Sequence, residues 1–344
     1  MGGRSPGSVG GVDFEARVAG YRDVSAALAA LDDRRLRQLL DAAPVVHTGF
    51  GGTAVRLEIA GRPVFAKRVP LTAIERRNEG STANLFALPA HYQFGVGSAG
   101  FGVWRELAAH LATTEWVLDR RHEGFPLLYH WRVVDGVSPV PLDRAEIASS
   151  VEFWHGSTAV RRRLEALADA SAAVVLFCEH FPGTARQWVT GREVSDAWGV
   201  MADYADSVEF LWDNGWAHFD GHFGNVLTDG RRLYCTDFGL ATSSAFELSG
   251  EEVEFLALTA GHDACYAVTK VVNWLAGSAL GVREHLALAE FLRRGGMSGL
   301  PAEANTFVWR HAPIARVVNE FYARLHTERR TAPYPAEQLR AAIG

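Results

Sequence analysis

The chain has 344 residues, of which 48% are hydrophobic and 22% charged, and its formal net charge is −6. This composition is typical of a globular protein with a substantial core and excludes intrinsic disorder for most of the chain. The acidic balance provides no basic face for a nucleic acid, so we expect no nucleic-acid partner.

The three cysteines, Cys178, Cys235 and Cys265, are far apart in the sequence and odd in number. This spacing argues against a disulfide framework and a zinc site, and it is typical of free thiols in a reducing compartment. Residues 1–20 lack the apolar segment of a signal peptide, and the most apolar later stretch, residues 267–280, is too short to cross a membrane. We therefore expect a cytoplasmic protein with no membrane partner.

The first part of the chain changes from a helical to a strand pattern. Residues 24–40 carry leucines near a 3.6-residue period, which predicts an amphipathic helix within an N-terminal extension of residues 1–44. Residues 45–69 have alternating apolar positions, a glycine cluster at 49–52 and a turn at 61–63. Because glycine and proline mark turns between strands, we predict a three-stranded meander whose first turn is rich in glycine.

The middle of the chain mixes helix and strand signals. Residues 70–102 show no regular period, whereas residues 104–118 predict a helix. Apolar, β-branched and aromatic residues at 125–134 and 172–177 predict two further strands, which are separated by a polar stretch and a helix near 161–170.

After Gly183 the pattern is mainly helical. The run 198–216 has one apolar face, and two short strands are expected near 226–227 and 233–234.

The order of these elements predicts an α+β protein with two parts after the N-terminal extension. Residues 45–178 are expected to form a small antiparallel β-rich lobe with one main helix and with insertions at about 71–102 and 136–171. Residues 179–344 are expected to form a larger helical lobe that ends in a helical tail.

Three polar residues have a spacing that suits phosphoryl transfer. Asp220 follows the apolar run 198–216, Asn225 comes five residues later, and Asp237 comes twelve residues after Asn225. The two short strands between Asn225 and Asp237 would form a hairpin that brings these two side chains together. Paired oxygen ligands suit Mg²⁺ held between a protein and substrate phosphates, and the remaining carboxylate could face the attacking hydroxyl.

The His-x-Asp-x-x-x-x-Asn spacing from His218, the Asp-Phe-Gly at 237–239 and an upstream lysine resemble the protein kinase superfamily. The resemblance covers roughly residues 45–260 and includes the aminoglycoside phosphotransferases and other small-molecule kinases. It implies a bilobal protein-kinase-like fold, with ATP and Mg²⁺ as cofactors. It further implies Asp220 as the catalytic base or hydroxyl-orienting group, His218 as a brace of the loop, and Asn225 and Asp237 as magnesium ligands.

Lys67 matches the phosphate-anchoring lysine on the third strand. Of the 34 basic residues only Lys67 and Lys270 are lysines, so a lysine at this strand position is notable. A point-charge ammonium on a flexible stem can reach phosphates and a glutamate together, which a rigid guanidinium does less well. We favour Glu106 as the partner glutamate, and the alternatives are Glu75, Glu79 and Glu115.

The resemblance also assigns the remaining nucleotide contacts. Gly49, Gly51 and Gly52 would let backbone N–H groups approach the phosphates, although the third glycine of the kinase pattern falls at Ala54. The backbone around Glu179 to Phe181 would bind the adenine edge.

A second glycine pattern, Gly95-x-Gly97-x-x-Gly100, spells a dinucleotide-binding fingerprint. No βαβ unit is expected around it, so we interpret it as a mobile flap that leads into the helix of Glu106.

The acceptor is the least defined part of the prediction. His222 and Gly224 inside the catalytic loop are similar to the loops of small-molecule kinases, and no Ala-Pro-Glu follows the Asp-Phe-Gly. We therefore expect a hydroxyl on a small molecule or another non-standard substrate. The alternatives are a protein or peptide Ser/Thr kinase, and a pseudokinase or nucleotide-binding scaffold.

Overall fold

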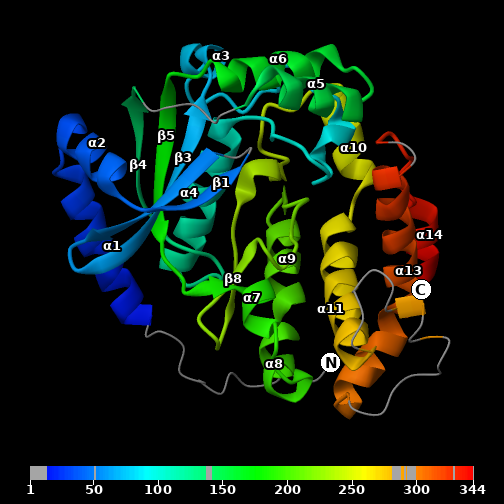
Figure 1. Cartoon of the computed structure of the whole chain (residues 1–344). Helices are drawn as coiled ribbons and strands as arrows, with labels where there is room; N and C mark the ends of the chain where they lie inside the picture. Colours follow the sequence, from blue (N-terminus) through cyan, green and yellow to red (C-terminus); the bar gives the residue numbers. More distant parts are fainter. Residues whose placement is uncertain are drawn as a thin grey trace.

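The computed structural model shows a mixed α+β protein with a small antiparallel sheet and a mainly helical C-terminal part (Figure 1). The predicted α+β class is therefore confirmed. The structure describes residues 14–49, 52–136, 142–280, 288–289, 292, 300–327 and 330–343.

The sheet has five strands in the order β1-β2-β3-β5-β4, and every neighbouring pair is antiparallel. Its strands are β1 (Val45–Gly49), β2 (Gly52–Ile59), β3 (Arg62–Leu71), β4 (Leu128–Asp135) and β5 (Ala172–Glu179). The predicted meander corresponds to β1, β2 and β3, and the two further predicted strands correspond to β4 and β5. All residues of β5 before Glu179 are buried, because helices cover both faces of the sheet.

Helices α1 (Phe14–Ala29) and α2 (Asp33–Ala42) cover one face of the sheet, and α4 (Val103–Leu118) covers the other (Figure 1). The prediction of one helix over residues 24–40 is wrong. The chain breaks at Asp32, whose side chain accepts the N–H of Arg35 at 2.7 Å. This contact satisfies an N–H that no helical carbonyl can reach, so it favours a new helix start.

The two stretches predicted as insertions pack against each other beyond one end of the sheet (Figure 1). The first contains α3 (Ala73–Arg77) and the 3₁₀ turn η1 (Ala90–Gln93), and the second contains α5 (Arg144–Phe153) and α6 (Thr158–Ala168). Helix α6 corresponds to the helix predicted near 161–170, whereas sequence reasoning missed α5.

The described C-terminal part consists mainly of helices, with a few short strands between them along the chain. The helices are α7 (Ala185–Val189), α8 (Val194–Met201), α9 (Tyr204–Asp213), α10 (Gly250–Leu258), α11 (His262–Leu280), α13 (Ala302–Thr327) and α14 (Ala336–Ile343). The strands are β6 (Gly183–Thr184), β7 (Trp216–Ala217), β8 (Val226–Thr228), β9 (Leu233–Cys235) and β10 (Thr242–Ser243), and a 3₁₀ turn η2 (Phe238–Leu240) follows β9. None of the described helices is long and apolar enough to span a membrane.

The helical run predicted over residues 198–216 is two helices, α8 and α9, so the prediction of a continuous run is wrong. The chain is interrupted at Ala202 and Asp203, which fall between the two helices. Met201 before the break and Tyr204 after it are both buried, so one apolar face continues across the interruption. Burial of that face fixes both helices more strongly than helical propensity does.

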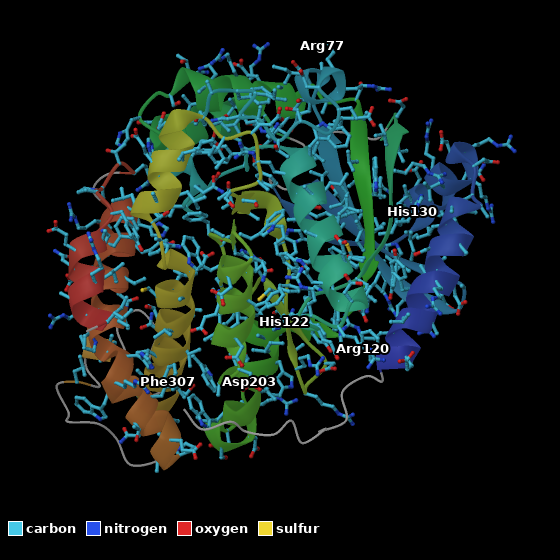
Figure 2. The ribbon with its side chains drawn as sticks, turned by 180° about the vertical axis from the view of Figure 1, so that it is seen from behind. Arg77, Arg120, His122, His130, Asp203 and Phe307 are labelled. Atoms are coloured by element: carbon cyan, nitrogen blue, oxygen red, sulfur yellow. The ribbon has the colours of Figure 1, made fainter. Side chains whose placement is uncertain are left out.

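Helix α4 and the loop after it contact the C-terminal helices, and Figure 2 labels His122 in that loop. In the loop after α4, His122 stacks on Phe210 of α9 with ring centroids 4.7 Å apart, and its Nε2 lies 2.8 Å from Oγ of Ser207. Near the other end of α4, Arg105 forms a buried ion pair with Glu252 of α10 at 2.7 Å. These contacts hold α4 between the sheet and the C-terminal helices.

The first prediction concerns this buried ion pair, whose side chains are only 2% and 7% exposed. Arg105→Ala leaves the Glu252 carboxylate buried without its cation, so we expect the free energy of unfolding to fall by about 3–5 kcal/mol. Urea denaturation measures this change. As a control, Arg161→Ala removes an Arg–Glu pair that is 47% and 51% exposed, and it should cost less than about 1 kcal/mol. Equal losses for the two variants would contradict the role of Arg105.

Candidate active site

A cavity of about 380 Å³ lies between the sheet and the C-terminal part. The sheet contributes Ala54, Phe65 and Lys67 to its walls, and the C-terminal part contributes Asn225 and Asp237. Three residues that the sequence assigned to phosphate and metal binding therefore face one space, although they are far apart in the chain.

Lys67 of β3 lies at the centre of this arrangement. Its Nζ is 2.6 Å from Oε1 of Glu106 on α4 and 2.9 Å from Oδ1 of Asp237. Burial opposes the charge on Lys67, but the carboxylates of Asp237 and Glu106 outweigh it and raise the pKa of Lys67 well above its usual range. The ammonium is thus permanently charged and fixed between two carboxylates.

The partner of Lys67 is Glu106, rather than the alternatives weighed from the sequence. Glu75 is buried and pairs instead with Arg163 at 2.9 Å, and Glu79 and Glu115 are exposed. Glu75 still contributes indirectly, because its Oε1 accepts the N–H of Val103 at the start of α4 at 3.0 Å. This contact helps to hold the helix that presents Glu106.

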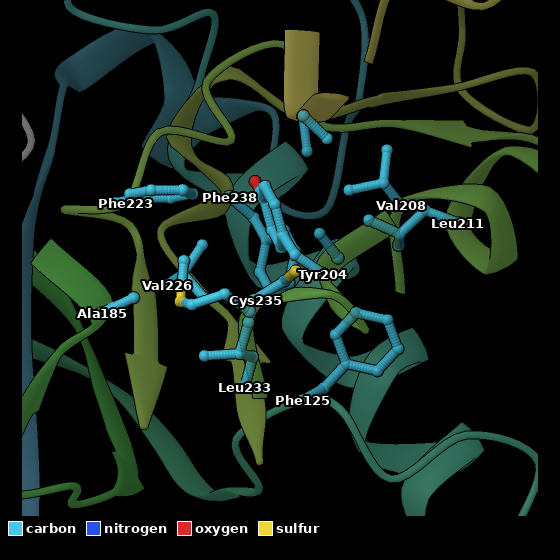
Figure 3. Packing of buried hydrophobic residues seen from close by; sticks show 14 of the residues in the cluster. Phe125, Ala185, Tyr204, Val208, Leu211, Phe223, Val226, Leu233, Cys235 and Phe238 are labelled. Carbon is cyan, nitrogen blue, oxygen red and sulfur yellow. The ribbon is translucent and has the colours of Figure 1, made fainter. Parts of the chain in front are cut away.

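Asp237 is positioned by the aromatic residue that follows it. Figure 3 shows Phe238 in the hydrophobic core near Tyr204 and Cys235. The Phe238 ring also meets His110 of α4 edge-on, with ring centroids 5.0 Å apart. Burial of this ring leaves the Asp237 carboxylate next to Lys67, while the backbone of Asp237 is left-handed at φ 60°. Such a conformation is unfavourable for a residue with a Cβ and persists because the packing enforces it.

The loop between β7 and β8 carries Asp220 and is held from two sides. Nδ2 of Asn225 donates to Oδ2 of Asp220 at 2.9 Å. Nε2 of His218 lies 2.9 Å from the carbonyl oxygen of Thr236, and Nδ1 of His218 accepts the Asp220 N–H at 3.3 Å. Because a carbonyl can only accept and an N–H can only donate, the proton is on Nε2 of His218. The imidazole therefore links the Asp220 loop to the strand that leads to Asp237.

A residue that sequence reasoning missed, Asp263 of α11, caps the same loop. Its carboxylate accepts the N–H groups of His218 and Phe219, the latter at 2.9 Å. Phe219 has a positive φ of 60°, so these bonds stabilise a backbone turn that is unfavourable by itself. Nothing in the local sequence could reveal this contact, since Asp263 lies on α11, in a part of the chain that is far from this loop in sequence.

The two aspartates have pKa values pushed in opposite directions. Burial and the nearby Asp237 charge raise the pKa of Asp220 to about 8. The Lys67 ammonium outweighs burial at Asp237 and holds the pKa of that carboxyl well below its usual range. One carboxylate is therefore a permanent anion, and the other can take up a proton near neutral pH.

Asn225 and Asp237 carry side-chain oxygens of the kind that magnesium prefers. The hairpin pairing of Val226 with Cys235, and the bond from the Thr236 N–H to the Asn225 carbonyl at 3.0 Å, place the two residues side by side as predicted. Since Nδ2 of Asn225 donates to Asp220, its amide oxygen is left for a cation. Among the residues that the structure describes, no group of three or more His, Cys, Asp or Glu could hold a metal. Such a two-residue site suits Mg²⁺, which usually keeps phosphate and water ligands.

Of the three glycines that were predicted to contact the phosphates, the structure describes Gly49 and Gly52. Gly49 and Gly52 pair across the turn between β1 and β2, which agrees with the predicted glycine-rich turn. Gly51 lies outside the described residues. The nearby positions that line the cavity are Val46, His47 and Ala54.

The predicted adenine contacts, Glu179 and Phe181, both line the cavity. However, the N–H of Glu179 donates to the Leu127 carbonyl at 2.8 Å, and its carboxylate pairs with Arg17 of α1 at 2.6 Å. The N-terminal extension therefore contacts a residue of the cavity wall, which the helical period of the extension did not reveal. The Phe181 ring packs on Tyr234 with ring centroids 4.1 Å apart.

His110 is a further cavity residue that sequence reasoning missed. It lies one helical turn after Glu106, so the i, i+4 spacing could have placed it on the same face of α4. Burial and the Lys67 charge lower the pKa of His110 to about 3. A neutral imidazole is therefore present at the back of the cavity.

A scan against protein-family models finds none that matches this chain, and a search of curated proteins finds no match. The geometry of the site is therefore the basis for the functional argument.

The second prediction follows from the raised pKa of Asp220, which is about 8 in the folded chain against 3.8 for an ordinary aspartate. Between these values the folded state binds more protons than the unfolded state, so stability falls as the pH rises. Asp220→Asn removes this loss. Without Mg²⁺ or nucleotide, we expect the variant to be more stable than the wild type by about 2–4 kcal/mol above pH 8, and the gain to disappear near pH 4.

Urea denaturation across this pH range measures the effect. The exposed Asp213, changed to Asn, controls for the chemistry of the substitution. A stability difference that does not depend on pH would contradict the assignment.

Proposed function

We propose that this chain has a bilobal protein-kinase-like fold and is an ATP- and Mg²⁺-dependent kinase that transfers the γ-phosphoryl group to a hydroxyl acceptor. The observation that carries the proposal is Lys67 bridging Glu106 and Asp237 inside a cavity that Asn225 also lines. Phosphoryl transfer depends mainly on positioning and on charge stabilisation, and this cluster provides both.

In this proposal the nucleotide occupies the cavity of about 380 Å³, with its adenine between Ala54 and Phe181. Lys67 has three N–H donors, two of which meet carboxylates, and the third remains for a phosphate oxygen. Asn225 and Asp237 would hold magnesium, which supplies positive charge to the phosphate oxygens. The small strands and the helices of the C-terminal part form the second lobe.

Asp220 acts on the acceptor. One of its oxygens accepts the Asn225 amide, so the other can accept a proton from the attacking hydroxyl. The acceptor oxygen forms a bond to the γ-phosphorus, the bond to the β–γ bridging oxygen breaks, and ADP leaves. A pKa near neutrality suits a group that takes up this proton and later releases it.

A small-molecule acceptor is favoured over a protein by the short segment after Asp-Phe-Gly. Its strand β10 pairs with β7 directly before the catalytic loop, and Glu247 holds the segment to Thr82 through a hydrogen bond of 2.9 Å. A protein kinase of this fold is the second candidate, and a nucleotide-binding scaffold is the third.

The third prediction tests catalysis itself. Wild-type protein should turn over ATP in the presence of Mg²⁺, and Asp220→Asn should lower the rate by about 10²–10⁴-fold because the proton acceptor is lost. Release of ADP measures the rate, and Asp213→Asn is the matched control at the surface. Wild-type turnover no higher than that of Asp220→Asn would favour the scaffold.

The fourth prediction concerns the identity of the cation. Lys67→Arg keeps the charge, but a planar guanidinium cannot meet Glu106, Asp237 and a phosphate with the geometry of an ammonium. We expect about a hundredfold lower turnover, the loss typical of a reacting group displaced by about 1 Å. ADP release at saturating ATP provides the measurement, and a rate equal to the wild type would refute the role of Lys67.

A further inference from the structure

The glycine-rich segment of residues 95–102 lies directly against the catalytic loop. A Cβ built on Gly95 would be 2.9 Å from Cγ of Asp220, and one built on Gly100 would be 2.5 Å from the carbonyl oxygen of Gly239. Real Cβ atoms essentially never come within 3.0 Å of such neighbours. Only glycine lets this backbone approach both groups so closely.

The same segment is anchored on both sides. The Gln93 side chain donates to the Leu240 carbonyl, and the Tyr92 hydroxyl accepts the Ala99 N–H at 2.9 Å. Between these contacts, the Phe94 ring packs edge-on against Phe321 with ring centroids 5.1 Å apart. The segment that the sequence predicted as a flap therefore covers one side of Asp220.

A second cavity, of about 100 Å³, opens between this segment and α6. Its walls include Ser98, Ala99, Gly100, Arg163, Leu167 and Asp220. Both inserted stretches thus meet at the catalytic carboxylate, one through the glycine-rich segment and the other through α6.

We propose that this second cavity is the acceptor site and that it takes a compact, uncharged polyol. The inference rests on the proposed kinase function and names the substrate class for it. The cavity of about 100 Å³ exceeds the roughly 10–15 Å³ that one water molecule needs and is much smaller than the cavity of about 380 Å³, so it suits a compact acceptor. Glycerol and a five-carbon polyol are the sizes that we test.

Charge argues for an uncharged acceptor. Three carboxylates, those of Glu106, Asp220 and Asp237, face the cavity. Its only cation among the described lining residues is Arg163, which already pairs with Glu75 at 2.9 Å. Glu106 and Asp237 share the Lys67 ammonium, so an anionic acceptor would meet repulsion mainly from the ionised Asp220 and from the phosphates of ATP.

The experiment measures ADP release with glycerol, ribitol, glycerate and a mixed protein substrate as acceptors. We expect both polyols to raise turnover above the rate in water, and glycerate and the protein substrate to have little effect. The ratio of kcat/KM for ribitol to kcat/KM for glycerol then reports the size of the site, and it is insensitive to a general loss of active protein.

Two wall variants should move this ratio in opposite directions. Leu167→Ala enlarges the cavity and should raise the ratio about tenfold, whereas Ala99→Leu fills it and should lower the ratio about tenfold. Adding or removing one methylene in an apolar pocket typically changes the relative rates of two substrates by at least about this factor. Leu164→Ala is the matched control, since Leu164 is on the same helix, is also 2% exposed and does not line the cavity. It should leave the ratio unchanged.

The inference is overturned if neither polyol raises turnover, if the protein substrate is preferred, or if Leu167→Ala and Leu164→Ala give the same ratio. In each of these cases Mg²⁺-dependent ATP turnover that is lost in Asp220→Asn would leave the kinase function standing. Absence of any such turnover in the wild type would instead refute the proposed function.

Discussion

The structure depends on one ammonium group, that of Lys67, whose side chain is only 13% exposed. Lys67 comes from β3, Glu106 from α4 and Asp237 from the segment after β9, so their ion pairs join three separate parts of the chain. A buried charge is costly unless its partners are close and well oriented. The packing of α4 and the burial of Phe238 are therefore requirements of this cluster, because each presents one of the two carboxylates.

Helix α4 owes its place to contacts from outside the sheet. Glu75 accepts the first N–H of the helix, and Arg105 ties its first turn to Glu252 of α10. These residues belong to an inserted stretch and to the C-terminal part, so the position of Glu106 is fixed by segments that flank the site on both sides. No rearrangement of the segment after Asp-Phe-Gly is needed to form the Lys67–Glu106 pair, because the pair is already present at 2.6 Å.

Two aspartates of the same chemistry receive different roles from their surroundings. Asp237 lies beside Lys67 and stays ionised, whereas partial burial and the nearby Asp237 charge raise the pKa of Asp220 to about 8. Environments that push two pKa values apart are the usual means by which a site obtains both a fixed anion and a proton acceptor. In the proposed reaction the anion binds metal and the acceptor serves the hydroxyl.

The sequence by itself determined the five strands of the sheet, the helix of Glu106 and the hairpin between Asn225 and Asp237. These features follow from local periodicity, turn residues and short spacings, which act within a few residues of the chain. The break at Asp32 and the interruption between α8 and α9 were missed, since the apolar period continues across both.

Only the tertiary structure decided which glutamate meets Lys67, which carboxylate caps the loop of Asp220, and what covers Asp220 itself. The sequence favoured Glu106 over Glu75 because Glu106 lies on the main predicted helix of this part, but the pairing itself depends on how α4 packs against β3. Gly95 and Asp220 are distant in sequence, so their close approach carries no local signal. Such contacts arise from the packing of whole elements, because burial and charge pairing act between segments that the chain order leaves apart.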